Sequence, residues 1–176
     1  DADCRSAFPN LRDEFHEIVD RLQSGTVGIK IQLSTVPVTI HHGRVMEFFR
    51  SLVYRPSSAA NLPILIHHAF LGNWKPIANE IVAQAQSLDT GLSIGLFFSI
   101  TCNEDIAFIK ESEVAAQTQG TELGDYRLRQ QQAACKDWPK VSLPADYRSP
   151  VKTTVETLFV SGDNDGATPL WFTEHT

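Results

Sequence analysis

The stretch from Leu158 to Pro169, with the sequence LFVSGDNDGATP, restricts the fold of this chain more than any other segment. Its apolar first residues predict a buried strand, and an acidic turn that contains glycine follows. Thr168 and Pro169 then have the residue types of a helix N-cap and of a first helical position. In open α/β folds the carboxyl ends of the strands carry the chemistry. The pattern therefore places the carboxylate of Asp165 at a functional edge of a sheet.

Residues 1–90 show mainly helical periodicity. Apolar residues at helical spacing predict amphipathic helices over residues 11–23 and 44–53. Two further helices are predicted, one over residues 62–71 and one that begins after Asn73. Alternation of apolar with small or polar residues over 25–40 predicts a small hairpin or an edge pair of strands.

Residues 91–176 have a different pattern. The continuous apolar, aromatic-rich run at 92–101 predicts a strand that is covered on both faces. Glycines divide the polar stretch 105–138 into two predicted short helices, and a proline-containing link leads to a second strand at 155–160. Two strands cannot form a stable sheet alone. We therefore expect an α/β fold whose other strands lie outside this chain.

Two carboxylates at predicted strand ends are candidate functional groups. Asp165 could orient a catalytic histidine, because a triad acid must be held by a rigid strand end. The alternative is a polar turn stabilised by local backbone hydrogen bonds, and Asp163 lies too close to the strand to be the acid. Glu104 could bind a substrate ammonium group. The alternative is that the carboxylate only stabilises the N-terminus of the helix that follows. Asp105 suits this role better, so Glu104 remains the better candidate for a ligand.

Residues 91–95, GLSIG, match the G-x-S-x-G pattern of a nucleophile elbow. Such a serine must follow a strand and precede a helix. Here a predicted helix precedes Ser93 and a predicted strand follows it, so the order is reversed. His175 also lies only ten residues after Asp165, whereas another strand normally intervenes before the histidine. We therefore do not expect Ser93 to be the nucleophile.

The composition excludes several classes of function. A net charge of -6 and the lack of a Lys/Arg run argue against nucleic-acid binding. The apolar stretches are too short to span a membrane. Neither CxxC, nor H-E-x-x-H, nor a glycine-rich phosphate loop occurs, so we expect no metal and no organic cofactor. The adjacent pairs His41-His42 and His67-His68 are expected to be structural, because neighbouring side chains diverge.

Three cysteines allow two interpretations. Cys4, Cys102 and Cys135 could all be buried thiols, or Cys102 could form a disulfide with Cys135 while Cys4 pairs with a residue upstream of Asp1. An odd number of cysteines fits a fragment of an exported, disulfide-bearing protein.

Several motifs together resemble the α/β-hydrolases of the tripeptidyl and prolyl aminopeptidase-like family. The resemblance rests on CRSAFP at 4–9, GNWKP at 72–76, TCNED at 101–105, CKDWP at 135–139 and S-G-x-x-D-x-x-T-P at 161–169. It implies that residues 1–90 form a helical lid. Residues 91–176 would then contain the strand that returns from the lid, further lid helices and the acid-bearing strand of an incomplete core.

The resemblance also implies a function, namely a serine exopeptidase that releases short peptides or residues from free amino termini. Asp165 would be the acid of a Ser-His-Asp triad, and Glu104 would bind the amino terminus of the peptide substrate. The family's nucleophile elbow and oxyanion loop would lie upstream of Asp1, and its histidine downstream of Thr176. We therefore expect a fragment that is inactive by itself. An esterase-like hydrolase of the same fold and a non-catalytic helical binding module are the alternatives.

Overall fold

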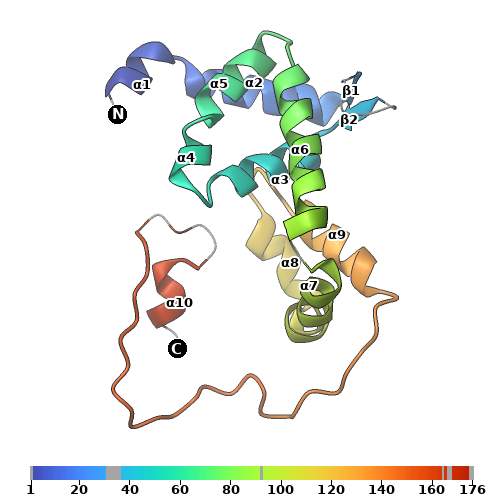
Figure 1. The fold of residues 1–176 in the computed structure, drawn as a ribbon, viewed down its shortest axis with the longest axis vertical. Helices are drawn as coiled ribbons and strands as arrows, with labels where there is room; N and C mark the ends of the chain where they lie inside the picture. Colours follow the sequence, from blue (N-terminus) through green and yellow to red (C-terminus); the bar gives the residue numbers. More distant parts are fainter. Residues whose placement is uncertain (1, 31–36, 92, 164, 166–167, 175–176) are drawn as a thin grey trace.

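The computed structural model describes residues 2–30, 37–91, 93–163, 165 and 168–174, and helices dominate this part of the chain (Figure 1). The helices are α1 (Ala2–Ala7), α2 (Leu11–Ser24), α3 (His42–Leu52), α4 (Pro56–Ala59), α5 (Leu62–Phe70), α6 (Lys75–Gly91), α7 (Ile94–Ile100), α8 (Glu111–Thr118), α9 (Tyr126–Cys135) and α10 (Leu170–Glu174). A π-helical turn, η1 (Thr101–Asp105), and a 3-10 turn, η2 (Ile106–Phe108), follow α7. The two strands, β1 (Val27–Ile29) and β2 (Val38–Ile40), form an antiparallel pair.

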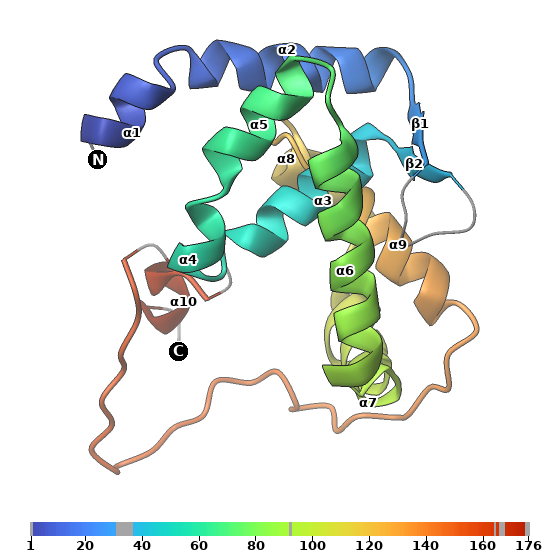
Figure 2. The same ribbon diagram turned by 45° about the horizontal axis from the view of Figure 1, so that its top comes forward.

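The predicted lid residues form one hydrophobic core. Helix α5 packs against α2 and crosses it at an angle, and α6 runs from this block toward α7 (Figure 2). Ile18 of α2, Ile40 of β2 and Ile77 of α6 are completely buried, so the helices and the hairpin share the same interior. The predicted helices over 11–23, 44–53 and 62–71, the helix after Asn73 and the hairpin are confirmed. Residues 31–36 of the predicted hairpin lie outside the described residues.

The second half of the chain packs on the first through α9. Gly43 of α3 allows this contact, because a Cβ atom at this position would lie 2.3 Å from the Tyr126 ring. The ring of His41 packs edge-on against Tyr126, with 5.4 Å between the ring centroids. The division of residues 105–138 into two helices is also confirmed. Gly120 and Gly124, between α8 and α9, have the positive φ angles that glycine tolerates best.

The strand predicted over residues 92–101 is wrong. Residues 94–100 form α7, and the π-helical turn η1 continues it to Asp105. Leu92 lies outside the described residues. A strand depends on neighbours for its backbone hydrogen bonds, whereas a helix makes these bonds within itself. Leu96 of α7 is 60% exposed, so the run is not covered on both faces either.

Residues 151–160 are extended, but no ladder pairs them with another strand in the described chain. They belong to the long loop that leaves α9 and leads to α10 (Figure 1). Their apolar side chains face solvent, and Leu158 and Val160 are 87% and 84% exposed. The predicted strand at 155–160 is therefore not formed as a sheet member in this structure, although its sequence has the pattern of a buried strand.

Candidate functional site

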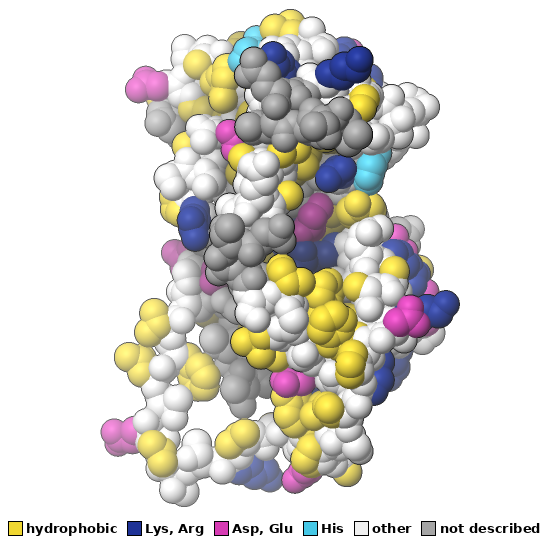
Figure 3. All heavy atoms as spheres, turned by 45° about the vertical axis from the view of Figure 1, so that its right-hand side comes forward, with side chains coloured by type: hydrophobic (Ala, Val, Ile, Leu, Met, Phe, Trp, Pro, Cys, Tyr) yellow, Lys and Arg dark blue, Asp and Glu magenta, His cyan; other side chains and the backbone are white. Residues whose placement is uncertain are grey.

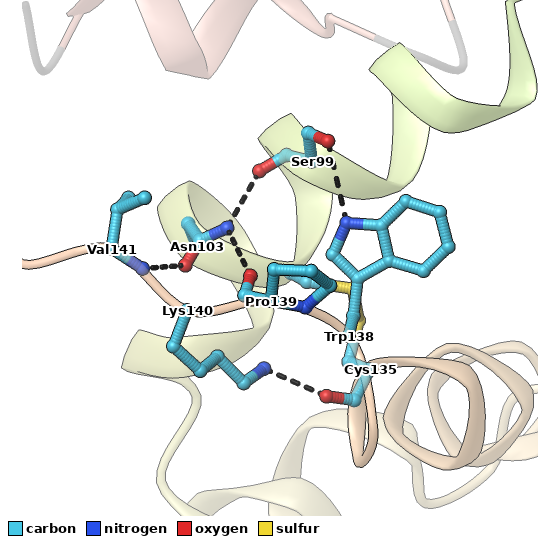
Figure 4. Close-up of a disulfide and its surroundings, with 8 residues drawn as sticks. Ser99, Asn103, Cys135, Trp138, Pro139, Lys140 and Val141 are labelled. Atoms are coloured by element: carbon cyan, nitrogen blue, oxygen red, sulfur yellow. Dashed lines mark hydrogen bonds between the residues drawn. A yellow bond between two sulfur atoms is a disulfide. The ribbon is translucent and has the colours of Figure 1, made fainter.

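Glu104 lies in η1, and the two residues that precede it, Cys102 and Asn103, anchor this turn. Cys102 forms a disulfide with Cys135 at the end of α9, and both residues are buried. The disulfide predicted as one of two alternatives is thus confirmed, while Cys4 is an exposed free thiol. The disulfide holds the π-helical turn against α9 (Figure 4).

Asn103 supplies a second anchor beside Glu104. Its side-chain amide donates hydrogen bonds to the carbonyl oxygens of Ser99, at 2.8 Å, and Pro139, at 3.3 Å. Its side-chain oxygen accepts a hydrogen bond from the backbone N–H of Val141 at 2.9 Å (Figure 4). The residue is only 6% exposed, so these bonds satisfy a buried polar group. Asn103 therefore ties η1 to the segment that follows α9.

Two more hydrogen bonds fix the same junction. The indole Nε1 of Trp138 donates to the Ser99 hydroxyl at 3.3 Å, and the Lys140 ammonium donates to the carbonyl oxygen of Cys135 at 2.7 Å. Figure 4 shows these groups around the disulfide, between α7 and the chain that leaves α9. The backbone that carries Glu104 is consequently held by a covalent bond and by a network of hydrogen bonds.

The Glu104 carboxylate is partly exposed and accepts a hydrogen bond from the hydroxyl of Tyr147. This hydrogen bond raises the pKa of the Tyr147 hydroxyl, because loss of its proton would place two negative charges together. Among the described residues, no lysine or arginine forms an ion pair with Glu104. The carboxylate is thus positioned and can still accept a cation.

Asp165 lies in the turn before α10, and its carboxylate is fixed by Thr168. One oxygen, Oδ1, accepts from the backbone N–H of Thr168 at 3.0 Å, and Oδ2 accepts from the Thr168 hydroxyl at 2.7 Å. The Ser161 hydroxyl donates to the Thr168 carbonyl oxygen at 3.3 Å and closes the turn. These hydrogen bonds of Asp165 are local, as the polar-turn interpretation predicts. These bonds also give the carboxylate a fixed direction, as a triad acid requires.

The structure does not bring the two carboxylates together. Glu104 bonds with Tyr147, while Asp165 bonds with Thr168 at the far end of the long loop. Figures 1 and 2 both show α10 well apart from α7. The two predicted site residues therefore occupy separate parts of the described fold.

Ser93 caps a helix, α7, and this helix stands where the sequence predicted a strand. Its hydroxyl accepts a hydrogen bond from the backbone N–H of Leu96 at 3.4 Å and so caps the start of α7. The element before it is helix α6, so no strand leads into this serine. A nucleophile elbow is therefore absent at this G-x-S-x-G sequence. His175, which follows Asp165 in the sequence, lies outside the described residues.

One histidine of each adjacent pair bonds within the fold. His41 caps α3, because its Nδ1 accepts from the backbone N–H of Arg44 at 3.3 Å, and burial lowers its pKa. His67 contacts the carboxylate of Glu14 at 3.0 Å, across α2 and α5. Within the described ranges, no group of three or more His, Cys, Asp or Glu residues could hold a metal ion. No helix in the same ranges is long and apolar enough to cross a membrane.

Sequence reasoning missed Asn103 and Tyr147 as supports of Glu104. Asn103 reaches residues 36 and 38 positions away, and Tyr147 reaches Glu104 across 43 positions. Hydrogen bonds of such separation leave no local pattern in a single sequence. The TCNED motif marks residues 101–105 as an unusual segment, but it does not indicate the partners of Asn103 or Glu104.

Residues 120–176 match the family described as TAP-like protein, a family of α/β-hydrolases. No curated protein and no solved structure gives a significant match to the chain. The matched segment contains Cys135, the apolar residues 155–160 and the turn of Asp165, whereas Glu104 lies before it. The match confirms the family resemblance for this part of the chain. The described residues themselves are mainly helical, so the α/β class rests on this match.

Proposed function

We propose that this chain supplies the lid and the triad acid of a serine exopeptidase, because residues 120–176 match the TAP-like family of α/β-hydrolases. The observation that carries the proposal is the fixed carboxylate of Asp165, on an acidic turn inside the matched segment. In a Ser-His-Asp triad the acid orients the histidine and stabilises its charged form.

The exposed residues 151–160 support an α/β core that is completed by other parts of the protein. Burying a Val, Leu or Phe side chain is worth roughly 1.5–3 kcal/mol. Leu158, Phe159 and Val160 are all more than half exposed in the described structure. In our proposal this segment pairs with further strands, and Asp165 then lies at the carboxyl edge of the sheet. The catalytic serine and histidine would come from outside residues 1–176.

Glu104 would give the enzyme its preference for free amino termini. Its carboxylate is partly exposed, hydrogen-bonded to Tyr147 and without a lysine or arginine partner in the described structure. A peptide ammonium group would form charge-assisted hydrogen bonds with it. The Cys102–Cys135 disulfide and Asn103 keep the backbone of η1 in place, so little ordering would be needed when the substrate binds.

The replacement Glu104→Gln in the intact protein tests this function. We expect kcat/KM for peptides with a free amino terminus to fall by about 10- to 100-fold, because a hydrogen bond to a charged group is worth roughly 1.5–3 kcal/mol. Cleavage of N-acetylated peptides and of small esters should stay unchanged, since they carry no ammonium group. The measurement is a comparison of kcat/KM between free and acetylated forms of one peptide.

Asp105→Asn is the matched control, because it removes the exposed neighbouring carboxylate and should leave the preference for free amino termini intact. If the intact protein cleaves esters but no peptides, the esterase-like alternative of the same fold replaces the exopeptidase. If Glu104→Gln and the parent protein prefer free amino termini equally, Glu104 does not bind the amine. A protein without any hydrolytic activity would favour the helical binding module.

A further inference from the structure

A cleft opens between α3, α7 and α9, and neither Glu104 nor Asp165 is among the residues that line it. Its volume is about 350 Å³, and Phe97, Phe98, Tyr126 and Gln130 form much of its wall. Figure 3, which brings the right-hand side of Figure 1 forward, shows hydrophobic side chains gathered beside acidic and basic ones on this face. Ligand sites are commonly apolar clefts that contain a few polar groups, and this cleft has that composition.

The carboxylate of Glu47, which lines the cleft, is paired with two arginines. Glu47 accepts hydrogen bonds from Arg50 through both oxygens, at 2.7 and 2.9 Å, and its Oε1 also accepts one from Arg127. Burial opposes ionisation of Glu47, but the hydrogen bonds and charges of the two arginines outweigh it and lower the pKa. Arg50 lies outside the cleft lining and takes two of the hydrogen bonds to Glu47, so Arg127, which does line the cleft, shares the charge of Glu47 with a second arginine.

Arg127 has hydrogen-bond donors that no acceptor in the described residues uses. Only its Nη1 group bonds to Glu47, and in the described part of the chain no acceptor pairs with its Nε–H or its Nη2 group. The side chain is 38% exposed and lines the cleft beside the two phenylalanines. The guanidinium fork matches the two oxygens of a carboxylate, so the open donors could hold such a group with two parallel hydrogen bonds.

We propose that this cleft binds a carboxylate attached to an aromatic or other apolar group, with Arg127 holding the carboxylate and Phe97 and Phe98 packing on the apolar part. Two kinds of compound have this chemistry, namely the C-terminal residue of a peptide and a free arylalkyl acid. The cleft volume lies at the lower end of the range of about 300–1,000 Å³ that is usual for ligand pockets. It therefore suits a single residue or a small acid. The proposal does not depend on the serine chemistry or on Glu104.

Calorimetric titration of the intact protein tests this site with N-acetyl-L-phenylalanine as the probe. N-acetyl-L-phenylalaninamide, which lacks the carboxylate, should bind at least about tenfold more weakly, as expected when a charge-assisted hydrogen-bond pair is lost. 3-Phenylpropionate carries the carboxylate and the ring without the peptide group. Equal binding of this acid would indicate a site for arylalkyl acids, whereas much weaker binding would indicate a site for a peptide C-terminus.

The variant Arg127→Gln should weaken the binding of N-acetyl-L-phenylalanine by at least about tenfold. Glu47 keeps both bonds to Arg50 in this variant, so the fold should be retained, and a thermal melt checks this. Arg129→Gln is the matched control, because Arg129 lies on the same helix but pairs with Glu111 and Asp125 outside the cleft. This control should bind the probe like the parent protein.

If Arg127→Gln does not fold, Arg127→Lys serves instead. It keeps the positive charge beside Glu47 but loses the fork, and it should also bind the probe more weakly than the parent. Three results would overturn the proposal: equal binding of the acid and its amide, unchanged binding by the Arg127 variant, or an equal loss in Arg129→Gln.

Discussion

The variant Asp165→Asn should lose about 10⁴-fold in kcat in the intact protein, the effect that this replacement has in a Ser-His-Asp triad. The amide cannot stabilise the charged histidine, and it favours the wrong tautomer of the ring. Thr168 can still donate to the amide oxygen of the asparagine, so the turn before α10 should persist. KM should change little, because Asp165 does not bind substrate in this account. Steady-state kinetics with a free-amino peptide measures both constants.

Asp163→Asn is the control for this experiment. Asp163 is exposed, lies in the same turn and has the same charge, so its replacement should leave kcat within a few-fold of the parent value. A large loss in Asp163→Asn together with a small one in Asp165→Asn would transfer the triad role to Asp163. Equal activity of both variants and the parent would leave Asp165 with only its role in the turn.

Removal of the Cys102–Cys135 disulfide should produce the largest change in stability. The double variant Cys102→Ala/Cys135→Ala frees a loop with a sequence separation of 33 residues. The loop entropy of the unfolded chain predicts a loss of about 4 kcal/mol for a loop of this length. Both cysteines are buried, so the two alanines also leave a small cavity. Thermal unfolding of the intact protein should show a decrease in Tm of about 10 °C.

Cys4→Ala separates the disulfide from a general effect of cysteine replacement. Cys4 is an exposed thiol, so this variant should change the free energy of unfolding by less than about 0.5 kcal/mol. The double variant should also raise KM for free-amino peptides, because η1 carries Glu104 and loses its covalent anchor. A double variant with the stability of the parent protein would contradict this view of η1.

Much of the first half of the fold can be predicted from the sequence. Helices α2, α3 and α5 each have an apolar face with helical spacing. Such faces are stable when they pack together in a common core, as they do here. The glycines between α8 and α9 also have a local signature, since their positive φ angles suit glycine best. These features depend on residues that are close in the sequence.

The apolar runs of the second half are less informative. Residues 92–101 and 155–160 both have the composition of buried strands, yet the first forms α7 and η1 and the second is extended without a partner. An apolar run of this length does not distinguish a strand from a buried helix. Whether such a run becomes a strand depends on neighbouring strands that can pair with it. The presence of these strands is a property of the whole sheet and not of the run itself.

The candidate site was only partly predictable for a related reason. The motif around Asp165 is continuous in sequence, and the bonds to Thr168 span three positions. The support of Glu104 by Asn103 and Tyr147 and the cleft at Arg127 join segments that are far apart in the chain. Such arrangements become visible only once the chain is folded.

The most direct test of the central claim is labelling of the intact protein with a fluorophosphonate, followed by mass spectrometry of the modified peptide. This reagent reacts with the activated serine of serine hydrolases. We expect a single labelled serine that lies outside residues 1–176, and Asp165→Asn should slow its labelling. Ser93 should stay unmodified, because its hydroxyl caps α7. The absence of any labelled serine, or labelling of Ser93, would contradict the assignment of this chain to a Ser-His-Asp hydrolase.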